Sequence, residues 1–195
     1  MYSVFNSVVQ LWDTVAVMGL GFAGQIMVQG AKRKGALKVI GIDPLAGKRD
    51  LAKGLGADYA FDPQNPDTEK AISDLTRGAG VDVVFEAAGR EESMNMVTRI
   101  LRKNGTLVLY SWVMEPVRLA ISRWHDDAIS IRTTCVMHLN TPYEMFTWFD
   151  RLLVPYWQGL VQVKPLLSPP LALPDMARAF ELSSQPDTVK VLIRP

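Results

Sequence analysis

The chain has 195 residues, of which 48% are hydrophobic and 21% are charged, and its net charge is +1. This composition is typical of a globular protein with one large domain or two small ones, and it lacks the overall basic excess of a nucleic-acid-binding protein. The single cysteine, Cys135, excludes an intrachain disulfide and a cysteine-rich zinc site, and it fits a cytoplasmic protein.

No apolar run approaches the roughly 18 residues of a membrane span, so we expect no membrane partner. The first residues, 1–5, lack the positive charge of a signal peptide, and we expect none. One local basic patch, the Lys-Arg-Lys run at 32–34, does not change the expectation of no nucleic-acid partner.

The first half of the chain predicts alternating strands and helices. Short, mostly apolar runs bounded by Gly, Pro or Asp predict strands at 14–18, 38–42, 59–61, 81–86 and 106–110. The segments between them predict helices at 24–34, 47–55, 66–76 and 91–101. Such alternation predicts right-handed crossovers and a mainly parallel sheet with helices on both faces, the α/β class.

The second half is less regular. Residues 129–136 predict a sixth strand, and 142–153 predict a helix that Pro155 kinks or ends. Four prolines in 164–174 favour an extended segment. A helix is expected at 174–183 and a closing strand at 188–193.

Residues 19–24, Gly-Leu-Gly-Phe-Ala-Gly, fit the pattern G-x-G-x-x-G between a predicted strand and a predicted helix. In this context Gly19 makes the tight turn, Gly21 lets a pyrophosphate approach the backbone, and Gly24 lets the helix pack close to the strand. The N-terminus of the helix then offers N–H groups and a partial positive charge to the phosphates. The motif predicts a dinucleotide site in a Rossmann-type, doubly wound sheet of six strands.

Asp43, at the end of the second strand, lies 43 − 24 = 19 residues beyond the last glycine, close to the expected spacing of about 20. Its carboxylate can accept hydrogen bonds from both adenosine ribose hydroxyls and would repel a 2′-phosphate, so NAD is favoured over NADP. Lys48 and Arg49 lie close behind and could soften that preference. A simple Asp-Pro turn is the alternative reading of the same residues.

Two other strand ends face the same crevice if the sheet is parallel. They are residues 87–89, Ala-Ala-Gly, and residues 111–112, Ser-Trp. Small side chains at the first of these would let a cofactor pass close to the backbone, although an ordinary turn explains them equally well. The complete set of expected cofactor residues is Gly19, Gly21, Phe22, Ala23, Gly24, Asp43, Lys48, Ala88, Gly89 and Ser111.

The sequence resembles the medium-chain dehydrogenase/reductase family, which includes zinc-dependent alcohol, sorbitol and threonine dehydrogenases. The resemblance rests on residues 13–17, 19–24, 51–58, 80–84, 101–106, 173–181 and 189–193. It implies an NAD-binding domain at 1–140 and a C-terminal segment at 141–195 that completes it or packs on a catalytic domain. It also implies that Lys48 supports Asp43 at the ribose. One departure is Trp12, where the family usually has glycine.

By the same resemblance, the chain is the nucleotide-binding portion of an NAD(P)-dependent alcohol- or polyol-type oxidoreductase. In the family an N-terminal domain carries the zinc ligands and the proton relay, and we expect none of that domain in this chain. We therefore expect NAD binding without alcohol oxidation by this chain alone. Pairing through strand 130–136 is expected to make a homodimer.

A zinc site within the chain is not expected. Cys135 reads as a small residue inside a strand, His138 follows it closely, and His125 adjoins two aspartates in a predicted surface loop. Two alternatives to the oxidoreductase remain, namely a non-catalytic NAD-sensing module and, with less support, an S-adenosylmethionine-dependent methyltransferase. Loss of a partner domain would leave apolar surface at 112–114 and 169–171.

Overall fold

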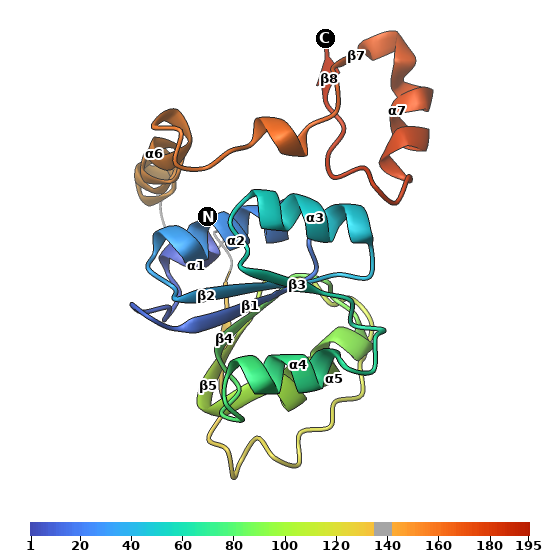
Figure 1. Cartoon of the computed structure of the whole chain (residues 1–195). Coiled ribbons are helices and arrows are strands. Elements are labelled where there is room, and N and C mark those ends of the chain that lie inside the picture. The colour runs from blue at the N-terminus through green and yellow to red at the C-terminus, as the bar shows by residue number, and fades with distance from the viewer. Residues whose placement is uncertain (135–141) are drawn as a thin grey trace.

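Six parallel strands form the central sheet of the protein (Figure 1). The structure, a computed structural model, describes residues 1–134 and 142–195. The strand order is β3-β2-β1-β4-β5-β6, and each neighbouring pair is parallel. The strands are β1 (Thr14–Met18), β2 (Lys38–Ile42), β3 (Tyr59–Phe61), β4 (Val81–Glu86), β5 (Leu101–Leu109) and β6 (Ser130–Thr133). The predicted doubly wound sheet is therefore confirmed.

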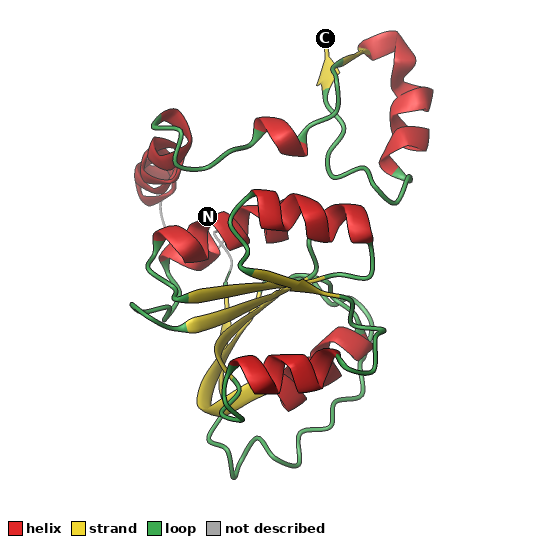
Figure 2. Cartoon of the chain, viewed as in Figure 1, coloured by secondary structure: helices red, strands yellow, loops and turns green. Residues whose placement is uncertain are grey.

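Helices cover both faces of the sheet, as Figures 1 and 2 show. The helices before α6 are α1 (Tyr2–Phe5), α2 (Phe22–Arg33), α3 (Ala46–Gly54), α4 (Thr68–Leu75) and α5 (Glu91–Ile100). Helices α1, α2 and α3 lie on one face, and α4 and α5 lie on the other. Because successive side chains of a strand point to opposite faces, Val15 and Val17 join the core under α2, whereas Ala16 and Met18 join the core with α5.

The fifth strand begins earlier than predicted. We expected the helix to reach Leu101 and an Asn104-Gly105 turn to precede the strand, but Leu101 already pairs with Val81. The register then shifts between Val81 and Val83, and Asn104 takes a left-handed φ of 56°. The Asn-Gly pair therefore acts as an irregularity inside the strand and not as the turn before it.

The C-terminal part contains α6 (Pro142–Trp157), the short 3₁₀ turns η2 (Lys164–Leu166) and η3 (Leu173–Asp175), β7 (Leu171–Ala172), α7 (Met176–Ser183) and β8 (Ile193–Arg194). We expected α6 to end near residue 153, with Pro155 kinking or ending it. The helix is longer than expected, because it includes Pro155 and ends at Trp157. A proline in the last turn removes only one helical hydrogen bond, so the helix tolerates it there. The last predicted residues of β6, 135 and 136, lie outside the described residues.

The expected closing strand at 188–193 is mostly absent among the described residues, and β8 pairs with β7 over only two positions. An isolated bridge joins Leu167 to Lys190. The N–H groups of Ser168 and Leu171 donate to carbonyls of the opposite strand, whereas the two prolines at 169 and 170 have no N–H to donate. The hydrogen-bond ladder between 167–172 and 190–194 is therefore interrupted at the two prolines. The segment 164–174, which was expected to be extended, contains the 3₁₀ turn η2 and the start of η3.

The C-terminal part is tied to α2 by a buried glutamine. Gln29 is 4% exposed, and its amide accepts from the N–H of Gln162 at 2.6 Å and donates to the carbonyl of Gln162 at 3.0 Å. Nearby, Ile26 of α2 shares a small apolar cluster with Val161 and Leu166. This contact holds the end of α6 and η2 over the outer face of α2.

The basic run at 32–34 is used within the fold. Lys32 pairs with Asp58 at 2.7 Å, and Arg33 donates to the carbonyl of Leu160 at 3.1 Å. The Lys34 ammonium donates to carbonyls of the 4–7 segment, the shortest at 2.6 Å, and its burial lowers the pKa of this lysine. Lys34 therefore ties the N-terminal segment to α2, Arg33 ties the C-terminal part to it, and Lys32 ties it to the residue before β3. In the described part of the chain, no helix combines the length and hydrophobicity that crossing a membrane would need.

Trp12 has a left-handed φ of 70° although it is a bulky residue, and 75% of it is exposed. We expect Trp12→Gly to raise the free energy of unfolding by about 0.5–1 kcal/mol, because relief of roughly 1–2 kcal/mol of left-handed strain exceeds the extra entropy of glycine in the unfolded chain. Chemical denaturation of both proteins measures the change.

Trp112→Gly is the matched control, because Trp112 is 88% exposed and is not among the residues with positive φ in the described chain. This control should give no gain in stability. An equal gain in both variants would show that removal of exposed indole surface, and not relief of strain, causes the effect.

Candidate cofactor site

The glycine loop, residues 19–24, leads from β1 into α2 at the carboxyl edge of the sheet. Gly19 has a φ of 88°, and a Cβ added there would lie 2.9 Å from the backbone of Ala87. A Cβ on Gly24 would lie 1.9 Å from the carbonyl oxygen of Gly19. Both positions therefore exclude any side chain, as predicted from the motif.

Gly21 differs from the other two glycines, since a Cβ there would have no atom within 4 Å. The backbone at this position faces open space, which is the condition for close approach of a phosphate. Gly21 is also the N-cap of α2, and no side chain caps the helix. The first N–H groups of a 12-residue helix, at Phe22 and Ala23, are thus left for an anion, and the dipole of the helix favours one.

Asp43 is joined directly to the glycine loop. Its Oδ2 accepts from the N–H of Leu20 at 2.8 Å, and its Oδ1 accepts from the N–H of Leu45 at 2.9 Å. The side chain is buried at 7% exposure, yet each carboxylate oxygen has a second lone pair. The structure therefore brings together the two elements that the sequence singled out, and it leaves acceptor capacity for two hydroxyl groups.

The two basic residues behind Asp43 do different things. The Arg49 guanidinium donates to the carbonyls of Asp43 and Pro44, at 2.8 and 2.7 Å, and pairs with Asp62 at 3.3 Å. It therefore closes the turn between β2 and α3. Lys48 is half-buried, and its backbone carbonyl accepts from Gln25 at 2.9 Å, while its ammonium makes no ion pair within the described residues.

The turn after β4 and the end of β5 meet at Glu86, a residue that the sequence analysis did not select. Its Oε1 accepts from the N–H groups of Ala88 and Gly89 at 3.0 and 2.9 Å, and its Oε2 contacts the hydroxyl of Ser111. A Cβ on Gly89 would lie 3.2 Å from the Cβ of Ser111. The available signal was an acidic residue at the end of a strand that is apolar at every other position except Asp82.

Of the three residues considered and rejected as zinc ligands, only His125 lies in the described part of the chain. His125 is exposed in the loop before β6, and Cys135 and His138 lie outside the described residues. Within 1–134 and 142–195, no three His, Cys, Asp or Glu residues are grouped so that they could hold a metal ion. Trp112 and Met114 are 88% and 83% exposed, as expected for an uncovered apolar surface.

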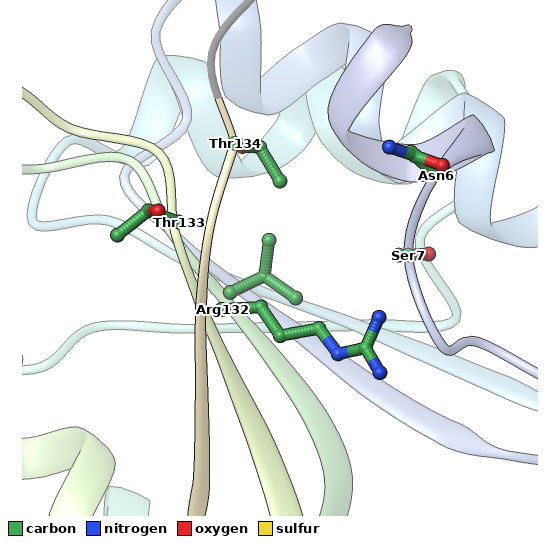
Figure 3. Close-up of a pocket in the computed structure, with 6 residues that line it drawn as sticks. Asn6, Ser7, Arg132, Thr133 and Thr134 are labelled. Carbon is green, nitrogen blue, oxygen red and sulfur yellow. The ribbon is translucent and has the colours of Figure 1, made fainter. Parts of the chain in front are cut away.

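A separate pocket of about 240 Å³ lies between the N-terminal segment and β6, and Figure 3 shows it. The Arg132 side chain extends from β6 toward Asn6 and Ser7 of that segment. The lining residues are Asn6, Ser7, Val108, Arg132, Thr133 and Thr134. None of the predicted cofactor residues is among them, so the candidate site rests on the geometry of the strand-end loops.

Comparison with known proteins supports this geometry. A family model described as zinc-binding dehydrogenase matches residues 23–151. The D-guloside 3-dehydrogenase of Escherichia coli is 41% identical over 107 residues, covering 55% of this chain and 31% of that protein. The erythritol/L-threitol dehydrogenase of Mycolicibacterium smegmatis is 37% identical over 127 residues, covering 65% and 35%.

Solved structures agree over the whole chain. An alcohol dehydrogenase zinc-binding domain protein from Burkholderia ambifaria matches 98% of this chain and 51% of its own with a TM-score of 0.87 at 24% identity, which supports the fold. A zinc-binding dehydrogenase from Sinorhizobium meliloti, bound to NADP, matches 100% and 56% with a TM-score of 0.84 at 26% identity. The chain thus spans about a third to a little over half of these relatives. It belongs to the zinc-binding dehydrogenase family and corresponds to the cofactor-binding segment of a medium-chain dehydrogenase/reductase.

Proposed function

We propose that this chain is the nucleotide-binding portion of an NAD(P)-dependent oxidoreductase that acts on alcohols or polyols. The observation that carries the proposal is the joining of the glycine loop to Asp43 through the N–H of Leu20. Open space at Gly21 and an uncapped α2 provide the phosphate site beside it. The names of the relatives, a guloside and an erythritol/threitol dehydrogenase, support the class of substrate.

The residues of this chain bind and orient the cofactor. The N–H groups at the start of α2 hold the pyrophosphate, and Asp43 accepts from the hydroxyls of the adenosine ribose. The strand order reverses between β1 and β4, so residues at the end of β2 and at the ends of β4 and β5 would hold opposite halves of the cofactor. When bound, the nicotinamide supplies hydride transfer.

Zinc is implied by the name of the family, but the residues that the structure describes do not offer three grouped ligands for it. We therefore assign no zinc-dependent step and no proton transfer to them. The proposal for this chain is that it binds the cofactor. Oxidation of the substrate would require catalytic groups other than the described residues.

NAD is the proposed cofactor in preference to NADP. A buried carboxylate at the ribose repels a 2′-phosphate, and Arg49, one of the two nearby cations, is already bonded to two carbonyls and to Asp62. Lys48 is the remaining cation that could attract a 2′-phosphate. The NADP bound to the Sinorhizobium meliloti relative makes this preference a point to be tested directly.

We also propose that β6 is a dimer interface. All four residues of β6, Ser130–Thr133, are exposed, and the strand pairs only with β5 among the described strands. A free edge of this kind can pair with its symmetry mate and extend the sheet across a twofold axis.

Calorimetric titration of the intact chain with NADH, NADPH and S-adenosylmethionine tests the class of ligand. We expect NADH to bind more tightly than NADPH, and S-adenosylmethionine not to bind.

Asp43→Asn should lower the affinity for NADH by about tenfold or more, because a charge-assisted hydrogen bond is lost, and should reduce the ratio of the NADH affinity to the NADPH affinity. Asp74→Asn, which removes an exposed ion pair with Lys70 on α4, is the control and should keep the preference for NADH over NADPH. An unchanged ratio of affinities in Asp43→Asn would contradict the assignment of Asp43.

Gly24→Ala should abolish measurable NADH binding and lower the free energy of unfolding by about 1–3 kcal/mol, because the added methyl group would overlap the carbonyl of Gly19. Gly54→Ala is the control, since a Cβ there meets nothing within 4 Å and alanine is the better helix former. Calorimetry and urea unfolding report the two quantities. Normal NADH binding by Gly24→Ala would remove the glycine loop from the proposed site.

Arg132→Glu should shift the elution of the chain on gel filtration from dimer toward monomer, because it places new negative charges on both sides of the proposed axis. Arg118→Glu, which changes an exposed arginine away from β6, should leave the elution unchanged. A monomeric wild-type chain would refute the interface, as would an Arg132→Glu protein that remains dimeric.

A further inference from the structure

Glu86 is a completely buried carboxylate, with 0% exposure, at the carboxyl end of β4. Oε1 accepts from the N–H of Ala88, the N–H of Gly89 and the hydroxyl of Ser93, at 3.0, 2.9 and 2.8 Å. Oε2 is held by the hydroxyl of Ser111. The carboxylate therefore connects the turn after β4, the first turn of α5 and Ser111, the second residue after β5.

This carboxylate is not needed to fill the core. Burial of a charged group is costly unless hydrogen bonds replace its water, and Glu86 makes no ion pair with a Lys or Arg among the described residues. Four donors satisfy it instead. The four hydrogen bonds hold each of those donors in a fixed position, which an apolar side chain could not do.

The groups that Glu86 holds lie in one half of the proposed cofactor site. Asp43 and the glycine loop stand at the ends of β2 and β1, where the adenosine and pyrophosphate are proposed to bind. The strand order reverses between β1 and β4, and on the β4 side of this point Gly89 and Ser111 lie just beyond the ends of β4 and β5. A dinucleotide crossing the sheet edge would place its nicotinamide half there.

We propose that Glu86 is a positioning residue that sets the affinity for the nicotinamide half of the cofactor and leaves the adenosine half to Asp43. It does so by holding the Ala88-Gly89 backbone and the Ser111 side chain in one arrangement. This inference rests on the proposed function, and it predicts that the two halves of the cofactor respond separately to substitution.

The test compares NADH with ADP-ribose, which lacks the nicotinamide, on the intact chain by calorimetry. We expect Glu86→Ala to weaken NADH binding by about tenfold, since several donors at the nicotinamide half lose their common acceptor, and to change ADP-ribose binding by less than about twofold. The emission of NADH bound to this variant should move toward that of free NADH. Glu86→Gln keeps an acceptor for Ala88 and Gly89, so it should restore most of the affinity.

Asp82→Asn is the matched control at the opposite end of the same strand. Asp82 accepts from the N–H of Thr14 at 2.7 Å and pairs with Arg102 at 2.6 Å. This variant should lower stability without changing the ratio of the two affinities. If Glu86→Ala does not fold, Ser111→Ala removes the contact at the far end of the carboxylate and should weaken NADH binding several-fold, again sparing ADP-ribose.

The outcomes separate the two claims. A wild-type chain that binds neither NADH nor ADP-ribose overturns the proposed function and, with it, the role of Glu86. A wild-type chain that binds both, with an unchanged ratio of affinities in Glu86→Ala and Ser111→Ala, overturns the role of Glu86 alone. Equal weakening of both ligands would show that Glu86 only stabilises the fold.

Discussion

The backbone of α2 passes so close to the end of β1 that residue 24 has no room for a side chain, with only 1.9 Å between a hypothetical Cβ and the carbonyl of Gly19. The direction in which α2 leaves the sheet depends on this contact, and so does the position of its N-terminus over the sheet edge. The same turn places the N–H of Leu20 within reach of Asp43. Because protein interiors are close-packed, a displacement here would move the proposed phosphate and ribose sites together.

Two buried carboxylates organise the edge of the sheet around that junction. Asp43 joins the end of β2 to the glycine loop, and Glu86 joins the turn after β4 to Ser111, two residues beyond β5. Each accepts hydrogen bonds from backbone N–H groups of the neighbouring loops, which satisfies the buried carboxylate and holds those loops in position. The two halves of the proposed cofactor site therefore have similar supports built on different strands.

Most of the Rossmann-type half could be predicted, because its signals are local. Apolar runs, glycines and the spacing to Asp43 lie within a few tens of residues of one another, and the strands at 14–18, 38–42, 59–61 and 81–86 appear with the predicted bounds. The C-terminal part was predicted less well. Its strands depend on pairing between 167–172 and 190–194, which the prolines at 169 and 170 interrupt, and periodicity along the sequence does not report such pairing.

Within the site, the glycine loop and Asp43 were recognisable because particular residue types must occupy particular positions. Glu86 had only a weak sequence signal: three of its donors, Ala88, Gly89 and Ser93, lie within seven residues of it, but the contact with Ser111 exists only because β4 and β5 pair. The sequence by itself determined the class of fold, the family and the glycine loop, because the backbone geometry of that loop demands glycine. Only the tertiary structure decided which side chains support the loops, because hydrogen bonds to a buried carboxylate depend on the distance between strand ends and not on their separation along the chain.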